Sequence, residues 1–151
     1  MIDSIQRIAQ ENPDALALGD GENSWTYREL DDAVEERASQ LLDLGAGPGI
    51  TIAFASEVDA LAVQYVHAVF RTGSTIAPVN PQLGLQGAAI EQLDPQIVLL
   101  SKQDEVTLGS YLEEYGYSYD AVSVSGRMAS WTIKKSNRRR CVEPERTCDF
   151  P

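Results

Sequence analysis

The 151-residue chain lacks several features that define common protein classes. It has no apolar run near the ~20 residues that a membrane-spanning helix needs, and its N-terminal sequence, MIDSIQRIAQENPD, has no apolar core like that of a signal peptide. We therefore expect no membrane partner and a cytoplasmic location. The two cysteines, Cys141 and Cys148, have no second pair and no nearby histidine, so we interpret them as free thiols rather than zinc ligands.

Lysine is nearly absent from most of the chain, because Lys102 is the only lysine before residue 127. Residues 1–126 carry 5 Lys and Arg against 20 Asp and Glu, whereas residues 127–151 carry 7 against 3. The formal net charge of −11 is therefore an average over two unlike parts. An acidic surface almost without lysine is typical of proteins that stay soluble in high salt, so we expect a halophilic source.

This change in charge predicts a boundary near Gly126. We interpret residues 1–126 as a partial α/β domain and residues 127–151 as an unrelated basic tail that is disordered or irregular, and we hypothesise that the tail is an out-of-frame product. The tail carries a basic cluster at residues 134–140, but a strongly acidic body repels a polyanion, so we expect no nucleic-acid partner.

Helical and strand patterns alternate along the acidic part of the chain. We expect helices over residues 2–9, 26–44, 58–72, 88–93 and 105–115, and strands over residues 15–18, 24–26, 50–54, 75–79, 97–100 and 121–124. Strands that are continuous apolar runs between helices indicate a parallel sheet covered on both sides. The predicted fold class is therefore α/β, a layered, mostly parallel sheet with helices on both faces.

Two of the predicted helices begin with capping residues. Thr26 and Glu29 form a capping box, in which the threonine hydroxyl accepts from the third helical amide and the glutamate reaches back to the threonine amide. Ser56 and Asp59 offer a second cap of the Ser-x-x-Asp kind. Gly45 is suited to the position just after a helix, where the backbone turns left-handed.

Two features resemble functional motifs without satisfying their requirements. The glycines of Gly45–Gly49 follow a helix and precede a strand, the reverse of the order in a dinucleotide-binding loop, so we interpret them as a helix end and turn. His67 is the only histidine and has no partners at metal-ligand or catalytic spacing, so we interpret it as structural or superficial. Spacing therefore assigns no catalytic, cofactor-binding or metal-ligating residue.

Several blocks of sequence resemble, in order, the N-terminal part of the adenylate-forming enzymes, the AMP-dependent synthetases and ligases that include acyl-CoA synthetases. The blocks are SWTYREL at 24–30, LGAGPG at 44–49, the strand at 50–54, AVFRTG at 68–73 and APVNP at 77–81. The resemblance implies that a carboxylate attacks the α-phosphate of ATP, which gives an acyl-adenylate and pyrophosphate. A thiol, often that of coenzyme A, then displaces AMP, and full-length relatives use ATP, Mg²⁺ and CoA.

The chain departs from that family downstream of residue 100. The family's phosphate loop, rich in Ser, Thr and Gly and ending in Pro-Lys-Gly, is missing where residues 122–131 read VSVSGRMASW. We therefore expect a truncated acid–thiol ligase that is inactive alone and needs no cofactor of its own. Two alternatives stay open: a subunit of a split ligase, completed by the missing remainder on another chain, and a small stand-alone α/β binding module with a basic interaction tail.

Overall fold

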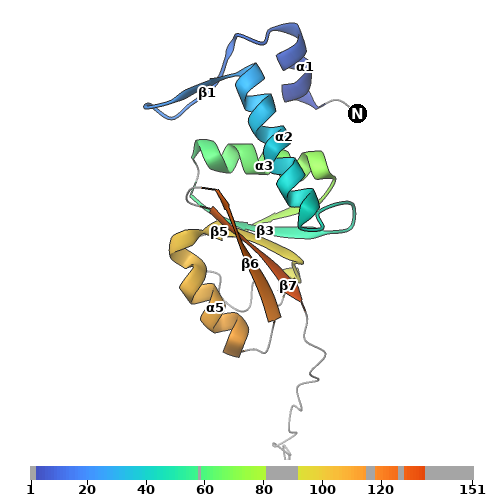
Figure 1. The fold of residues 1–151 in the computed structure, drawn as a ribbon, viewed down its shortest axis with the longest axis vertical. Coiled ribbons are helices and arrows are strands. Elements are labelled where there is room, and N and C mark those ends of the chain that lie inside the picture. Colours follow the sequence, from blue (N-terminus) through green and yellow to red (C-terminus); the bar gives the residue numbers. More distant parts are fainter. Residues whose placement is uncertain (1–2, 58, 81–91, 115–117, 126–127, 135–151) are drawn as a thin grey trace, which may run out of the picture.

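A computed structural model describes residues 3–57, 59–80, 92–114, 118–125 and 128–134 (Figure 1). In chain order its elements are α1 (Ser4–Glu11), β1 (Leu16–Gly19), β2 (Ser24–Thr26), α2 (Tyr27–Asp43), β3 (Thr51–Ala55), α3 (Ala60–Thr72), β4 (Thr75–Pro78), β5 (Ile97–Ser101), the 3-10 helix η2 (Lys102–Asp104), α5 (Glu105–Glu114), β6 (Ser118–Ser125) and β7 (Met128–Lys134). Most of the helix expected over residues 88–93 lies outside the described residues.

The main sheet has five strands in the order β4-β3-β5-β7-β6, and β1 and β2 form a separate antiparallel hairpin. Strand β3 pairs in parallel with β4 and β5, whereas β7 is antiparallel to both of its neighbours, β5 and β6. Only β7 therefore runs against the other four strands. Figure 1 shows α2 and α3 on one side of this sheet and α5 on the other, which confirms the layered α/β fold.

The structure differs from the sequence expectation just after residue 127, where we predicted an irregular tail. Residues Met128–Lys134 form β7, which pairs with β5 from Ile97↔Thr132 to Ser101↔Met128. Strand β6 pairs with the other edge of β7. The sheet thus continues to residue 134, and the remaining tail residues, 135–151, lie outside the described part of the chain.

The hydrophobic core lies between the sheet and the layer of α2 and α3. It includes the helix residues Val34, Leu41 and Tyr65 and the strand residues Ile52 and Leu99, all of which are fully buried. Because side chains alternate along a strand, Val98 and Leu100 stand on the opposite face of β5, and both are also fully buried. Burial on both faces explains why β5 is a continuous apolar run. Among the described residues no helix is long and apolar enough to cross a membrane.

The start of α2 confirms the predicted capping box. The Glu29 amide donates to the Thr26 hydroxyl at 3.3 Å, and the Thr26 amide donates to the Glu29 carboxylate at 2.8 Å. The second cap differs from the expectation, because α3 begins two residues later than predicted. Asp59 itself is the capping residue, and its carboxylate accepts from the Ala62 amide at 2.7 Å. The hydroxyl of Ser56 instead donates to the Glu57 carbonyl.

Removal of the Thr26 hydroxyl tests the contribution of the capping box. We expect Thr26→Ala to lower the free energy of unfolding by about 1 kcal/mol, because an amide at the start of α2 loses its acceptor. Thr26→Ser keeps the acceptor and is the matched control, with an expected loss of less than about half that value. Urea unfolding followed by circular dichroism measures both, and equal losses would contradict the capping role.

Arg71 ties the three N-terminal helices together. Its guanidinium is 2.8 Å from both Asp3, just before α1, and Asp31, in α2, and it is 3.0 Å from Glu35, one turn further along α2. The Arg71 side chain is only 13% exposed. Charged hydrogen bonds of this length are among the strong ones in proteins. The network therefore fixes how α1 and α2 lie against α3.

The ionisation of Asp3 gives this network a dependence on pH. Partial burial by itself would raise the pKa of Asp3, but hydrogen bonds from the Gln6 amide and the Arg71 side chain outweigh it and hold the pKa below its usual value. A lowered pKa stabilises the fold above the ordinary aspartate pKa of about 3.9, and that stability is lost as pH falls through the lower, folded-state value.

We therefore expect Asp3→Asn to be less stable than the unmodified chain at pH 7, and we expect the difference to shrink below about pH 4. Asparagine can still cap α1 through its single oxygen, so the change removes the charge and the acceptor for the Arg71 Nε–H. Thermal unfolding at several pH values between 7 and 3 measures the effect. A difference in Tm that stayed constant over this range would show that the Asp3 charge contributes nothing.

Candidate functional site

The carboxyl ends of the parallel strands border a hollow of about 460 Å³, which we call the edge hollow. It lies between the ends of β3 and β4 and one side of α3. Its lining residues are Phe54, Ser56, Ala62, Val63, Val66, His67, Pro78, Val79 and Asn80. In open α/β sheets ligands bind at this edge of the strands, so the edge hollow is the candidate site that the fold itself indicates.

His67 is the titratable side chain of the edge hollow. Its ring meets that of Phe70 edge-on, with centroids 6.4 Å apart and an interplanar angle of 81°. Within the described part of the chain, no three His, Cys, Asp or Glu side chains gather closely enough to hold a metal ion. The arrangement supports aromatic packing, and our interpretation of His67 as structural or superficial stays a prediction.

Two carboxylates follow the neighbouring strands at the same edge of the sheet. Glu57 comes just after β3, and Asp104 ends the short helix η2 that follows β5. Burial and, secondarily, the negative charge of Glu57 raise the pKa of Asp104 above its usual value. Glu57 and Asp104 lie at the same edge because β3 is beside β5 in the sheet, and this strand order could not be predicted from the sequence alone.

The glycine-rich segment lies at the opposite, amino end of β3. Gly45 follows the end of α2 with φ +94°, and Gly49 has φ +83°. The Gly47 amide donates to the Ser74 hydroxyl at 2.8 Å, and that hydroxyl donates to the Gly47 carbonyl at 3.1 Å. The segment is thus a helix end and turn held by Ser74, as predicted.

The structure does not place the other residues that the sequence analysis examined. Cys141, Cys148 and the cluster at 135–140 lie outside the described residues, and Lys134 is described only as the end of β7. The network around Arg71 was not predicted, because it joins residues up to 68 positions apart. The buried polar side chain of Gln64 was not predicted either, although a glutamine within an apolar helix can be seen in the sequence.

Comparison with known proteins gives the family. A family model described as AMP-binding enzyme matches residues 5–136. The isonitrile lipopeptide synthase of Mycobacterium tuberculosis is 44% identical over 69 residues, which are 46% of this chain and 3% of that protein. Surfactin synthase subunit 1 of Bacillus subtilis is 33% identical over 86 residues, which are 57% of this chain and 2% of that protein.

Solved structures agree with this assignment. The o-succinylbenzoate CoA synthetase of Bacillus subtilis superposes with a TM-score of 0.65 and 25% identity over 73% of this chain and 23% of that one. The N-terminal domain of FACL13 from Mycobacterium tuberculosis gives a TM-score of 0.64 at 14% identity, over 70% of this chain and 28% of that one, and so shows the shared fold alone. The match over residues 5–136, the layered sheet and the TM-scores together show that the chain belongs to the family of AMP-binding, adenylate-forming enzymes.

Proposed function

We propose that the chain is the N-terminal scaffold of an AMP-forming acid–thiol ligase. The observation that carries the proposal is the family match over residues 5–136, which includes both the sheet and the helices that cover it. The complete enzyme would join a carboxylate to the α-phosphate of ATP, release pyrophosphate, and then pass the acyl group to a thiol while AMP leaves. In this proposal the nucleotide site comes from sequence outside these residues.

The described residues support a scaffold role more than a chemical one. Among them no three potential ligands gather for a metal, so we assign them no step that involves Mg²⁺. The edge hollow has mostly apolar walls, and the neighbouring Phe70 is 57% exposed. Apolar surface of this kind is suited to packing against further protein. We therefore propose that the rest of the ligase packs at this edge of the sheet.

We propose coenzyme A as the thiol, because the CoA synthetase of Bacillus subtilis shares the fold over 73% of this chain. A thiol on a carrier protein is the second candidate, favoured by the 44% identity to a lipopeptide synthase over 69 residues. The exposed apolar edge also supports a split ligase, in which the remainder is a separate chain. From the acidic composition we further propose a cytoplasmic protein adapted to salt.

A chimera tests the scaffold role. Residues 3–101 would replace the matching segment of the Bacillus subtilis o-succinylbenzoate CoA synthetase, and ATP–pyrophosphate exchange with o-succinylbenzoate would be measured. Val66→Asp places a charge in the edge hollow, and Leu16→Asp places the same charge at a position that is 70% exposed and not part of the hollow's lining. We expect exchange in the chimera and in its Leu16→Asp form, and loss of exchange with Val66→Asp because the packing surface is disrupted.

A further inference from the structure

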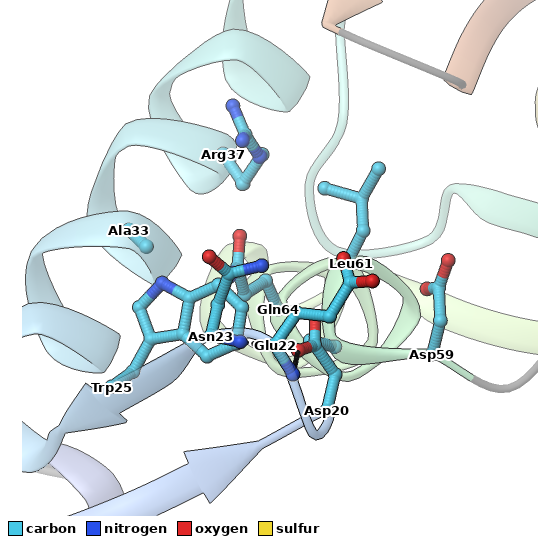
Figure 2. A pocket seen from close by; sticks show the side chains of 10 residues that line it. Asp20, Glu22, Asn23, Trp25, Ala33, Arg37, Asp59, Leu61 and Gln64 are labelled. Atoms are coloured by element: carbon cyan, nitrogen blue, oxygen red, sulfur yellow. Dashed lines mark hydrogen bonds between the residues drawn. The ribbon is translucent and has the colours of Figure 1, made fainter.

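A second hollow, distinct from the edge hollow, lies between the tip of the β1–β2 hairpin, the middle of α2 and the first turns of α3. We call it the hairpin hollow; its volume is about 640 Å³. Figure 2 shows its lining, which consists of Asp20, Glu22, Asn23, Trp25, Ala33, Arg37, Asp59, Ala60, Leu61 and Gln64. Nothing in the proposed ligase function uses these side chains.

Gln64 is the residue that indicates a ligand here. It is 4% exposed, it lines the hollow, and no hydrogen bond or ion pair joins its side-chain amide to another residue in the described part of the chain. The amide therefore has hydrogen-bonding capacity that the described residues leave unused. A ligand in the hairpin hollow would supply the missing partner.

Three carboxylates surround the same hollow and come from two separate elements. Asp20 and Glu22 belong to the hairpin tip, and Asp59 is the capping residue of α3. Asp20 accepts from the backbone amides of Glu22 and Asn23 at 3.0 and 2.7 Å, and Asp59 accepts from the Ala62 amide at 2.7 Å. Backbone amides therefore hold both of these carboxylates in place at the edge of the hollow.

Arg37 adds one positive charge to the wall, against the three carboxylates, and its Nε is buried without a hydrogen-bond partner among the described residues. Its guanidinium lies over the Tyr65 ring, 5.4 Å from the centroid, and is 3.8 Å from the Glu36 carboxylate. The lining therefore keeps an excess of negative charge. Trp25 and Leu61 provide apolar surface beside the carboxylates, and an aromatic face also attracts cations.

We propose that the hairpin hollow binds a linear aliphatic polyamine. Its ammonium groups pair with Asp20, Glu22 and Asp59, its methylene chain lies against Trp25 and Leu61, and one ammonium donates to the Gln64 carbonyl. The site needs two or more separated positive charges, since its carboxylates come from separate elements. Binding would tie the hairpin to α3, two parts of the fold that are far apart in sequence.

Isothermal titration calorimetry of the full chain with spermidine in 0.15 M NaCl tests the proposal. We expect one saturable site, and butylamine, which has a similar chain but one charge, to bind at least about tenfold more weakly because a charged hydrogen bond is lost. Gln64→Leu removes the unpartnered amide, so it should weaken spermidine binding by about tenfold without lowering the Tm.

Two charge variants separate a specific site from general attraction to an acidic protein. Glu22→Gln removes a carboxylate of the hollow, whereas Asp32→Asn removes an exposed carboxylate of α2 that is not part of its lining. We expect Glu22→Gln to weaken spermidine binding by about tenfold and Asp32→Asn by less than about twofold. Equal weakening by both variants, heat that never saturates, or equal affinity for butylamine would overturn the proposal.

Discussion

Replacement of Arg71 by methionine is expected to lower the free energy of unfolding by about 3 kcal/mol, since removal of one partner from a largely buried ion pair typically costs 3–5 kcal/mol. The expected value is at the low end because Glu35 is largely exposed. Methionine preserves most of the apolar stem, so the loss reports on the charge and its hydrogen bonds. Asp3 and Asp31 would be left as partly buried acids without their cation.

Two controls isolate this effect. Arg7 forms an ion pair with Glu11 in which both side chains are about 60% exposed, so Arg7→Met should cost no more than about 0.5 kcal/mol. Arg71→Lys keeps the charge but loses the planar guanidinium that contacts three acids at once. Its loss of unfolding free energy should therefore lie between those of Arg71→Met and Arg7→Met. Chemical unfolding followed by circular dichroism measures all three. A cost for Arg71→Met as small as that for Arg7→Met would contradict the network.

Truncation of Leu99 to alanine is expected to cost about 3 kcal/mol, because it leaves a cavity in the centre of the core. Leu99 is fully buried in β5, between β3 and β7. Leu100 points to the other face of the same strand and is also fully buried, so Leu100→Ala should cost a similar amount.

Leu16 is the matched control for both truncations, because it is a strand leucine that is 70% exposed. Leu16→Ala should change the free energy of unfolding by less than about 0.5 kcal/mol. Urea denaturation at constant salt measures the series. A neutral Leu100→Ala beside a costly Leu99→Ala would contradict a sheet that is covered on both faces.

Local features of the fold could be predicted from the sequence because their physical causes are local. The capping box at Thr26 depends on residues three apart, and the run at 97–100 carries its own evidence of burial on both faces. The left-handed turn at Gly45 is a property of glycine and its neighbours. These features need no knowledge of which elements meet in space.

Features that depend on distant pairing could not be predicted in the same way. Strand β7 lies in a part of the chain whose charge differs from the rest, and its place between β5 and β6 comes from backbone pairing, to which net charge is almost irrelevant. Arg71 meets Asp3 and Asp31 across 68 and 40 positions. The hairpin hollow around Gln64 likewise forms only when the hairpin, α2 and α3 come together.

ATP–pyrophosphate exchange is the measurement that tests most directly whether this chain is the scaffold of an adenylate-forming ligase. It would be measured over a panel of carboxylic acids for the chain alone, and with o-succinylbenzoate for the chimera that carries residues 3–101. We expect no exchange above background for the chain alone and clear exchange for the chimera. Exchange by the chain alone, or a folded chimera without exchange, would contradict the scaffold role.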